Sequence, residues 1–123
     1  MNIAIDYIKD SGNFDKERIV FAVKNDEQLG KYLIAESVLL DNARFSAKIK
    51  NIFWFPDQEL KQGDVVVLYT KTGNNNSNLN EDGSTTYFYY WGLSEPHLND
   101  NRPCVVLFDA SWDVRAIQKN ENQ

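Results

Sequence analysis

The sequence contains very little of the chemistry that most catalytic and metal-binding proteins use. It has one histidine, His97, and one cysteine, Cys104. A lone cysteine cannot form an internal disulfide, and the two residues together cannot supply the four ligands of the usual structural zinc sites. We therefore expect no cofactor and no metal site. Because Cys104 heads an apolar run with only Arg102 as a basic neighbour, we expect it to be a buried, unreactive side chain.

The chain also lacks a basic block and a long apolar run. Its net charge is -5 and its lysines and arginines are scattered, so it would repel a phosphate backbone, and nucleic acid is not an expected partner. No stretch approaches the roughly 20 apolar residues of a membrane helix, and the N-terminal segment does not resemble a signal peptide. We expect a cytoplasmic protein without membrane contact, folded as one domain over residues 1–123, with a frayed end at 118–123.

Aromatic and β-branched residues, in contrast, are common and occur in short runs. Pro56 ends the run Phe53-Trp54-Phe55, because proline cannot donate a hydrogen bond to a sheet. Gly63-Asp64 is typical of a turn and precedes the valine-rich run 65–69. The other predicted strands lie at 2–8, 18–24, within 32–40, over 44–55, and at 85–91, 104–108 and 112–117, while 73–84 is predicted to be a long exposed loop.

Short strands at this spacing, without a convincing helix, predict an all-β fold. The expected architecture is a two-sheet immunoglobulin-like sandwich of about seven to nine short strands. The runs 19–23, 65–69 and 104–108 are apolar on both strand faces. Since a sandwich strand usually has one wet face, we expect loops and, in part, a symmetric homodimer contact to cover the outer faces.

The same pattern resembles the lamin-tail domain. The resemblance is carried by Phe53-Trp54-Phe55-Pro56, Leu60, the run 63–68, and the apolar strand 105–109 before Val114. It covers roughly residues 19–117 and implies an immunoglobulin-like, non-catalytic β-sandwich, which in bacteria often accompanies secreted or nuclease-like domains and in animal lamins serves interaction. The chain departs from the family in the Asn-rich stretch 74–82 and in the strongly aromatic segment 87–91.

The aromatic strand offers the best candidate binding surface. Side chains alternate along a strand, so Tyr87, Tyr89 and Trp91 share one face and Phe88 and Tyr90 the other. Because Phe88 has no polar atom, we expect it to point inward with Tyr90 and the other three rings to form an exposed strip, unless neighbouring loops cover them. The favoured function is therefore a non-catalytic binding or protein-interaction module, or as a variant a module that binds a glycan or a small polar ligand.

An enzymatic alternative depends on the loop histidine. His97 has Glu95 and Asp100 nearby in the sequence, so a hydrolase that uses His97 with one of these carboxylates is the competing hypothesis. A solvated loop histidine is more common than a catalytic one. Asp109, Ser111 and Asp113 are typical of a turn. The predicted ligand-binding residues are Tyr87, Tyr89, Trp91, His97 and Asp100.

The Asn-rich stretch contains part of a calcium-loop pattern. Residues 78–83 place oxygen-bearing side chains at alternate positions and glycine at the sixth. The twelfth position is Tyr89, where a calcium loop needs a bidentate glutamate, so an exposed loop is favoured over an ion site. We expect deletion of residues 75–80 to change the melting temperature by only a few degrees.

Overall fold

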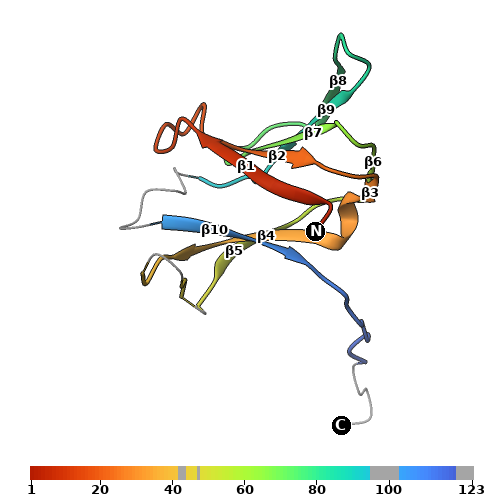
Figure 1. The fold of residues 1–123 in the computed structure, drawn as a ribbon. Helices are drawn as coiled ribbons and strands as arrows, with labels where there is room; N and C mark the ends of the chain where they lie inside the picture. Colours follow the sequence, from red (N-terminus) through yellow and green to blue (C-terminus); the bar gives the residue numbers. More distant parts are fainter. Residues whose placement is uncertain (42–43, 47, 95–102, 119–123) are drawn as a thin grey trace.

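The computed structural model describes residues 1–41, 44–46, 48–94 and 103–118, which are almost entirely β structure (Figure 1). A five-stranded sheet has the order β1 (Ile3–Lys9), β2 (Arg18–Val23), β7 (Val65–Tyr69), β9 (Thr85–Tyr90) and β8 (Asn76–Leu79). A three-stranded sheet has the order β10 (Pro103–Asp109), β4 (Tyr32–Val38) and β5 (Lys50–Trp54). The short strands β3 (Glu27–Gln28) and β6 (Glu59–Leu60) pair with each other, and a 3₁₀ turn, η1 (Leu29–Lys31), follows β3.

The two larger sheets lie one above the other and enclose the core, which confirms the all-β prediction and a sandwich-like arrangement (Figure 1). Alternate residues of each strand point into this layer, as strand geometry requires. The core residues from the two sheets include Ile3, Ile19, Phe21, Tyr32, Ile34, Phe55, Val66, Leu68 and Tyr89.

The five-stranded sheet is mixed, because β9 runs parallel to β7. All other paired strands of the described residues are antiparallel. After β7 the chain first forms β8 at the edge of the sheet. It then turns back and forms β9, which lies between β7 and β8. This path places residues 75–77 opposite the segment that follows β5.

The turn before β7 forms as the sequence predicts. Gly63 has a φ of +91°, which favours glycine, and the buried Asp64 follows it. The Asp64 carboxylate accepts hydrogen bonds from the backbone N–H of Lys61 at 2.8 Å and of Thr85 at 2.9 Å. Asp64 therefore ties the turn to the start of β9.

The predicted facing of the aromatic strand is wrong. The register pairs Tyr87 with Val66 and Tyr89 with Leu68, and both partners are fully buried in the core. Tyr89 is itself a core residue, and Tyr87 and Trp91 pack against the core. Phe88 and Tyr90 consequently occupy the outer face, where they are half-buried.

Three predicted segments also differ from the structure. The long strand predicted over 44–55 is reduced to β5 and an isolated bridge between Phe45 and Leu39; within β5 the pairing with β4 shifts register at Asn51, which has a φ of +50°. The stretch 73–84 is exposed as predicted, but it contains β8. No strand forms over 112–117 in the described tail, where Val114 and Ile117 are exposed, and the tail leads away from the sandwich (Figure 1).

Neighbouring side chains cover much of the outer face of the five-stranded sheet. Val20 and Val67 point outward yet are buried. The register places them in one row with Tyr7 on β1 and Phe88 on β9, whose larger side chains flank them. In the three-stranded sheet, by contrast, the apolar residues of β10 are only half-buried along most of the strand, so its outer face is less well covered.

Candidate functional site

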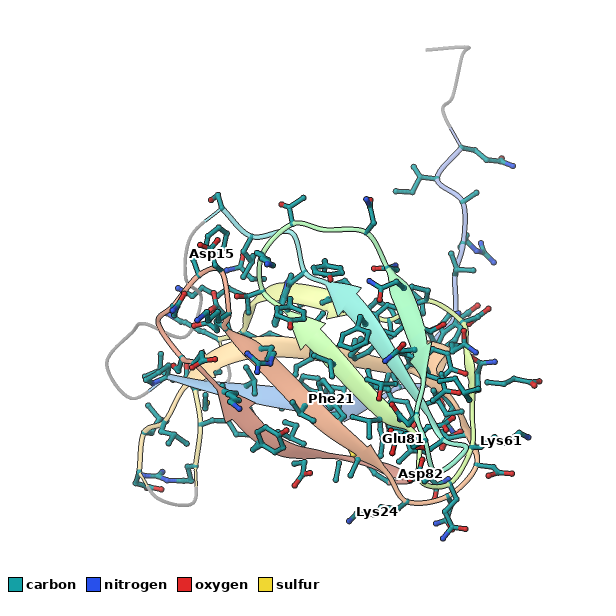
Figure 2. The ribbon with its side chains drawn as sticks, turned by 90° about the horizontal axis from the view of Figure 1, so that it is seen from above. Asp15, Phe21, Lys24, Lys61, Glu81 and Asp82 are labelled. Carbon is teal, nitrogen blue, oxygen red and sulfur yellow. The ribbon has the colours of Figure 1, made fainter. Side chains whose placement is uncertain are left out.

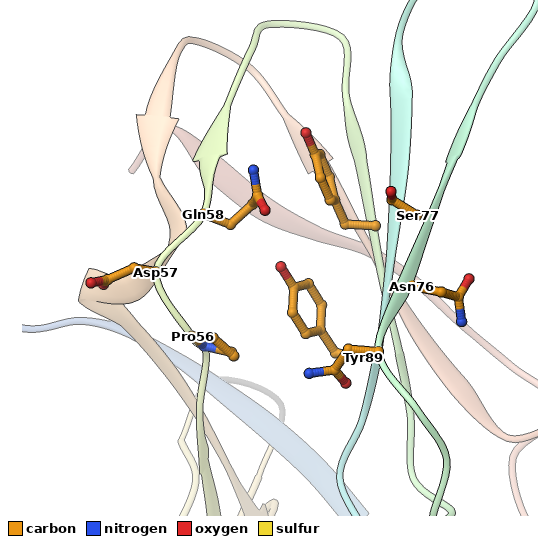
Figure 3. A pocket seen from close by; sticks show the side chains of 8 residues that line it. Pro56, Asp57, Gln58, Asn76, Ser77 and Tyr89 are labelled. Carbon is orange, nitrogen blue, oxygen red and sulfur yellow. The ribbon is translucent and has the colours of Figure 1, made fainter.

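A pocket of about 290 Å³ opens between the segment after β5 and the strands β8 and β9 (Figure 3). We call it the tyrosine pocket. Its lining consists of residues 56–58, residues 75–77, Tyr87 and Tyr89. Two of the predicted binding residues therefore lie together, although in a pocket at the margin of the core and not on an exposed strip.

Tyr89 places a buried phenol against this pocket. Its side chain is only 6% exposed, and its ring packs edge-on against Phe55 with 5.6 Å between ring centroids. The hydroxyl points toward Gln58, and no group in the described part of the chain hydrogen-bonds to it (Figure 3). Because Tyr89 lines the pocket, a molecule that enters the pocket can supply the hydrogen bond that the described residues do not.

The environment keeps this hydroxyl protonated. Burial, reinforced by the neighbouring Tyr87, raises the pKa of Tyr89 to about 12. The phenol is therefore neutral at physiological pH and able both to donate and to accept a hydrogen bond. A ligand that enters the pocket can satisfy it.

Gln28 fixes the opposite wall of the pocket. Its Oε1 atom accepts a hydrogen bond from the backbone N–H of Gln58 at 2.6 Å and another from the N–H of Gly30 at 3.1 Å. The N–H of Leu29 in turn donates to the carbonyl oxygen of Gln58 at 2.9 Å. These bonds hold residues 56–58 against the 3₁₀ turn, so the wall is preorganised.

The one carboxylate in the lining is directed elsewhere. Asp57 points away from Tyr89 and Gln58 (Figure 3), and its Oδ1 atom lies 1.9 Å from the position that a Cβ at residue 30 would occupy. Only glycine at residue 30 leaves room for this carboxylate. The groups that remain near Tyr89 are amides, a serine hydroxyl and phenols, which suit recognition of an uncharged polar molecule.

Trp91, the other described residue among those predicted, does not line this pocket. Trp91 is half-buried and packs against Phe53 with 6.1 Å between ring centroids. His97, Asp100 and Glu95 lie outside the described residues. Cys104 is half-buried, and burial raises the pKa of its thiol although a hydrogen bond with Ser37 opposes this.

Two polar residues of the calcium-like stretch, Asn80 and Asp82, make local contacts. The carboxylate of Asp82 accepts from the backbone N–H of Ser84 at 3.0 Å and from its hydroxyl at 2.6 Å. The amide of Asn80 contacts the hydroxyls of Ser84 and Thr86. Within the described ranges no three histidine, cysteine, aspartate or glutamate side chains are grouped to hold a metal ion.

The polar residues of the pocket were not predicted. Gln58 and residues 75–77 lie in stretches of ordinary turn composition, and they approach Tyr89 only because β8 forms the sheet edge beside β9. The Asn-rich stretch gives no signal of its own for β8, because asparagine and aspartate are depleted in strands.

The comparisons with known proteins provide no identity for the chain. No protein-family model matches the sequence, and no curated protein is significantly similar to it. In the part of the chain that the structure describes, no helix has the length and apolar character needed to cross a membrane.

Proposed function

We propose that this chain is a non-catalytic binding module with a lamin-tail-like, immunoglobulin-like sandwich fold, and that the tyrosine pocket binds an uncharged, hydroxyl-rich ligand of the saccharide class. The observation that supports this most is the buried Tyr89 hydroxyl, which faces the pocket without a described protein partner. A sugar hydroxyl would supply the missing hydrogen bond.

The composition of the lining favours this ligand class over charged ones. Gln58, Asn75, Ser77 and two phenols line the pocket, while the side chains of Asn76 and Asp57 are turned away (Figure 3). Neighbouring hydroxyls of a saccharide match side-chain amides, which both donate and accept. A ligand carrying a full charge would find no described opposite charge aimed at it near Tyr89.

The described residues do not test the hydrolase alternative. It needs His97 and a carboxylate, and neither the histidine nor Asp100 or Glu95 belongs to the described residues. The tyrosine pocket itself lacks a histidine or cysteine that would serve as a base or nucleophile. Binding is thus the function that the pocket chemistry favours.

The test is a titration with a panel of neutral mono- and oligosaccharides, monitored by NMR chemical shifts and by calorimetry. We expect Tyr89→Phe, which removes only the hydroxyl, to weaken binding about tenfold, which corresponds to a loss of about 1.4 kcal/mol of binding free energy. The matched control is Tyr7→Phe, which removes a hydroxyl from a half-exposed ring on β1, at the opposite edge of the five-stranded sheet, and should leave the affinity unchanged.

Two results would contradict the proposal. If no saccharide shifts the resonances of residues 56–58 or 75–77, the ligand class is wrong. If a saccharide binds but Tyr89→Phe binds it as tightly as the native chain, the tyrosine pocket is not the site.

A further inference from the structure

Two more pockets adjoin the tyrosine pocket. The tryptophan pocket, of about 360 Å³, lies between residues 28–31 and residues 110–112 and has Asp57 at its border. The turn pocket, of about 400 Å³, lies between the turns 61–64 and 82–85 and has Tyr87 at its border. Each of the three volumes is near the lower end of the roughly 300–1,000 Å³ of small-molecule sites.

Shared residues make the three pockets consecutive. Asp57 lines both the tryptophan pocket and the tyrosine pocket, and Tyr87 lines both the tyrosine pocket and the turn pocket. Residues 56–58 border the tyrosine pocket, with Asp57 shared by the tryptophan pocket, and residues 61–64 border the turn pocket. The series ends where Lys61, Glu81 and Asp82 lie at one end of the five-stranded sheet (Figure 2).

Trp112 provides a fixed aromatic surface at the other end. Its side chain is 57% exposed, and its ring packs edge-on against Trp54 with 4.8 Å between centroids. The Trp54 indole N–H donates to the carbonyl oxygen of Gly30 at 2.6 Å, and the backbone N–H of Ala110 donates to the carbonyl of Lys31 at 2.8 Å. These contacts hold the ring beside the Asp57 carboxylate.

This combination fits a sugar ring. A flat, exposed indole stacks on the apolar C–H face of a saccharide with little loss of side-chain entropy, while the neighbouring carboxylate and the Ser111 hydroxyl accept hydrogen bonds from its hydroxyls. The phenols of the tyrosine pocket can likewise contact the C–H groups of a sugar ring and hydrogen-bond to its hydroxyls.

Charges at the turn pocket are compensated locally. The Ser84 hydrogen bonds lower the pKa of Asp82, Asp64 accepts two backbone N–H groups, and Lys61 lies 3.7 Å from the Asp26 carboxylate. No strong single-sign field is therefore directed at a ligand from these groups, which again suits an uncharged one.

Resting on the proposed saccharide site, we propose that the ligand is a linear, uncharged glycan chain that occupies the tryptophan, tyrosine and turn pockets in succession. Trp112 stacks on one sugar unit, Tyr89 hydrogen-bonds to the next part of the chain, and the turn pocket holds the far end. The site therefore recognises the interior of a polymer and not a single sugar.

The experiment compares oligosaccharides of three and six units, built from glucose, mannose, xylose or N-acetylglucosamine, by calorimetry on the native chain. For the series that binds, we expect the longer ligand to bind at least about tenfold more tightly. Each further pocket that the same ligand fills adds contacts, whereas the translational and rotational entropy of the ligand is lost only once. Trp112→Ala should reduce this ratio toward one, and Tyr89→Phe should weaken both ligands. Tyr7→Ala, which removes a similarly exposed aromatic ring from β1, should change neither.

The outcomes separate the two proposals. Equal affinities of the short and long ligands, together with a retained Tyr89→Phe effect, would overturn the extended site and leave the saccharide pocket intact. A length advantage that survives in Trp112→Ala would also overturn it. Absence of binding by every series would overturn both, and NMR spectra of the variants establish that each remains folded.

Discussion

Tyr89 combines a large contribution to the core with an unsatisfied polar atom, so its ring and its hydroxyl affect stability in opposite directions. The ring fills space beside Phe55 in the core. Tyr89→Ala should therefore cost about 3–5 kcal/mol, whereas the facing predicted from sequence implied little cost. Tyr89→Phe should be neutral or stabilise by up to about 1 kcal/mol, because it removes a buried hydroxyl without a described partner.

Chemical denaturation of the two variants measures both effects. Removal of a polar group that serves a ligand commonly lowers affinity while stability is kept or raised, and we expect this pattern for Tyr89→Phe. A clear stability loss in Tyr89→Phe would show that the hydroxyl has a partner in the folded chain, and would remove the main support for the pocket.

Glu27 provides a second prediction at this scale, for acid sensitivity. Burial disfavours its charge, but hydrogen bonds from the Gln28 backbone and from the Asn2, Tyr32 and Lys31 side chains together lower the pKa of Glu27 to about 2. A lowered folded-state pKa means that the carboxylate stabilises the fold above its unfolded pKa of about 4.5 and that this contribution is lost as the pH falls toward 2.

Glu27→Gln tests this. Its deficit relative to the native chain should be about 2 kcal/mol at pH 7 and should shrink as the pH falls from about 4.5 to 2, measured by urea unfolding at each pH. Glu59→Gln, on the paired strand β6 but exposed, is the control and should show no such dependence. A deficit that does not change with pH would mean that Glu27 acts through packing and not through its charge.

Among the elements, β8 is where the prediction from sequence changes most. Its four residues are exposed, as the Asn-rich composition indicates, but they pair with β9 from Asn76–Phe88 to Leu79–Thr85. Deletion of residues 75–80 removes this ladder, uncovers the edge of β9 and opens the tyrosine pocket. We now expect a loss of about 2 kcal/mol, or roughly 5–10 °C in melting temperature.

A truncation after Trp112 is the matched control for this deletion. It removes residues 113–123, of which the described part, 113–118, is exposed and forms no strand, and it should leave the melting temperature nearly unchanged. If the deletion of 75–80 is as mild as the truncation, β8 contributes no stability in solution.

Sequence patterns predicted the elements whose ends have local causes. Pro56 stops the aromatic run, and Gly63-Asp64 starts β7, because the deciding forces act within a few residues. The face of β9 was not predictable, since both of its faces are aromatic and the choice depends on its parallel register with β7. The tail 112–117 alternates like a strand but meets no described partner, and alternation alone does not make a sheet.

The polar residues of the candidate site could not be predicted either, because their position depends on tertiary pairing. Tyr87 and Tyr89 could be selected from their composition, whereas Gln58 and residues 75–77 reach them through the strand order of the sheet. The predicted partners His97 and Asp100 remain untested, because they lie outside the described residues.

For the molecule as a whole, the outer face of the three-stranded sheet leads to a prediction about assembly. Cys104, Val106 and Phe108 alternate with the inward residues of β10, and Ile52 on β5 is exposed. We expect a weak symmetric dimer through this face. Sedimentation velocity should show association that increases with concentration in the native chain and is lost in Val106→Lys.

The control for the dimer is Tyr7→Lys, a similar change on β1 in the other sheet, which should associate as the native chain does. A strict monomer from micromolar to millimolar concentration would contradict the dimer. It would leave the proposed saccharide site unaffected, since that proposal does not require a second copy.

The parallel pairing of β7 with β9 also constrains the order in which the chain folds. Antiparallel β8 and β9 are joined by a short turn and can form a hairpin from local contacts, but β9 joins β7 only after the intervening residues have closed a longer loop. We therefore expect the hairpin to dock as a unit onto a sheet edge that β2 and β7 have already built. Before docking, that edge would be open to strands of other chains, so the tyrosine pocket and protection from aggregation would be completed in the same late folding step.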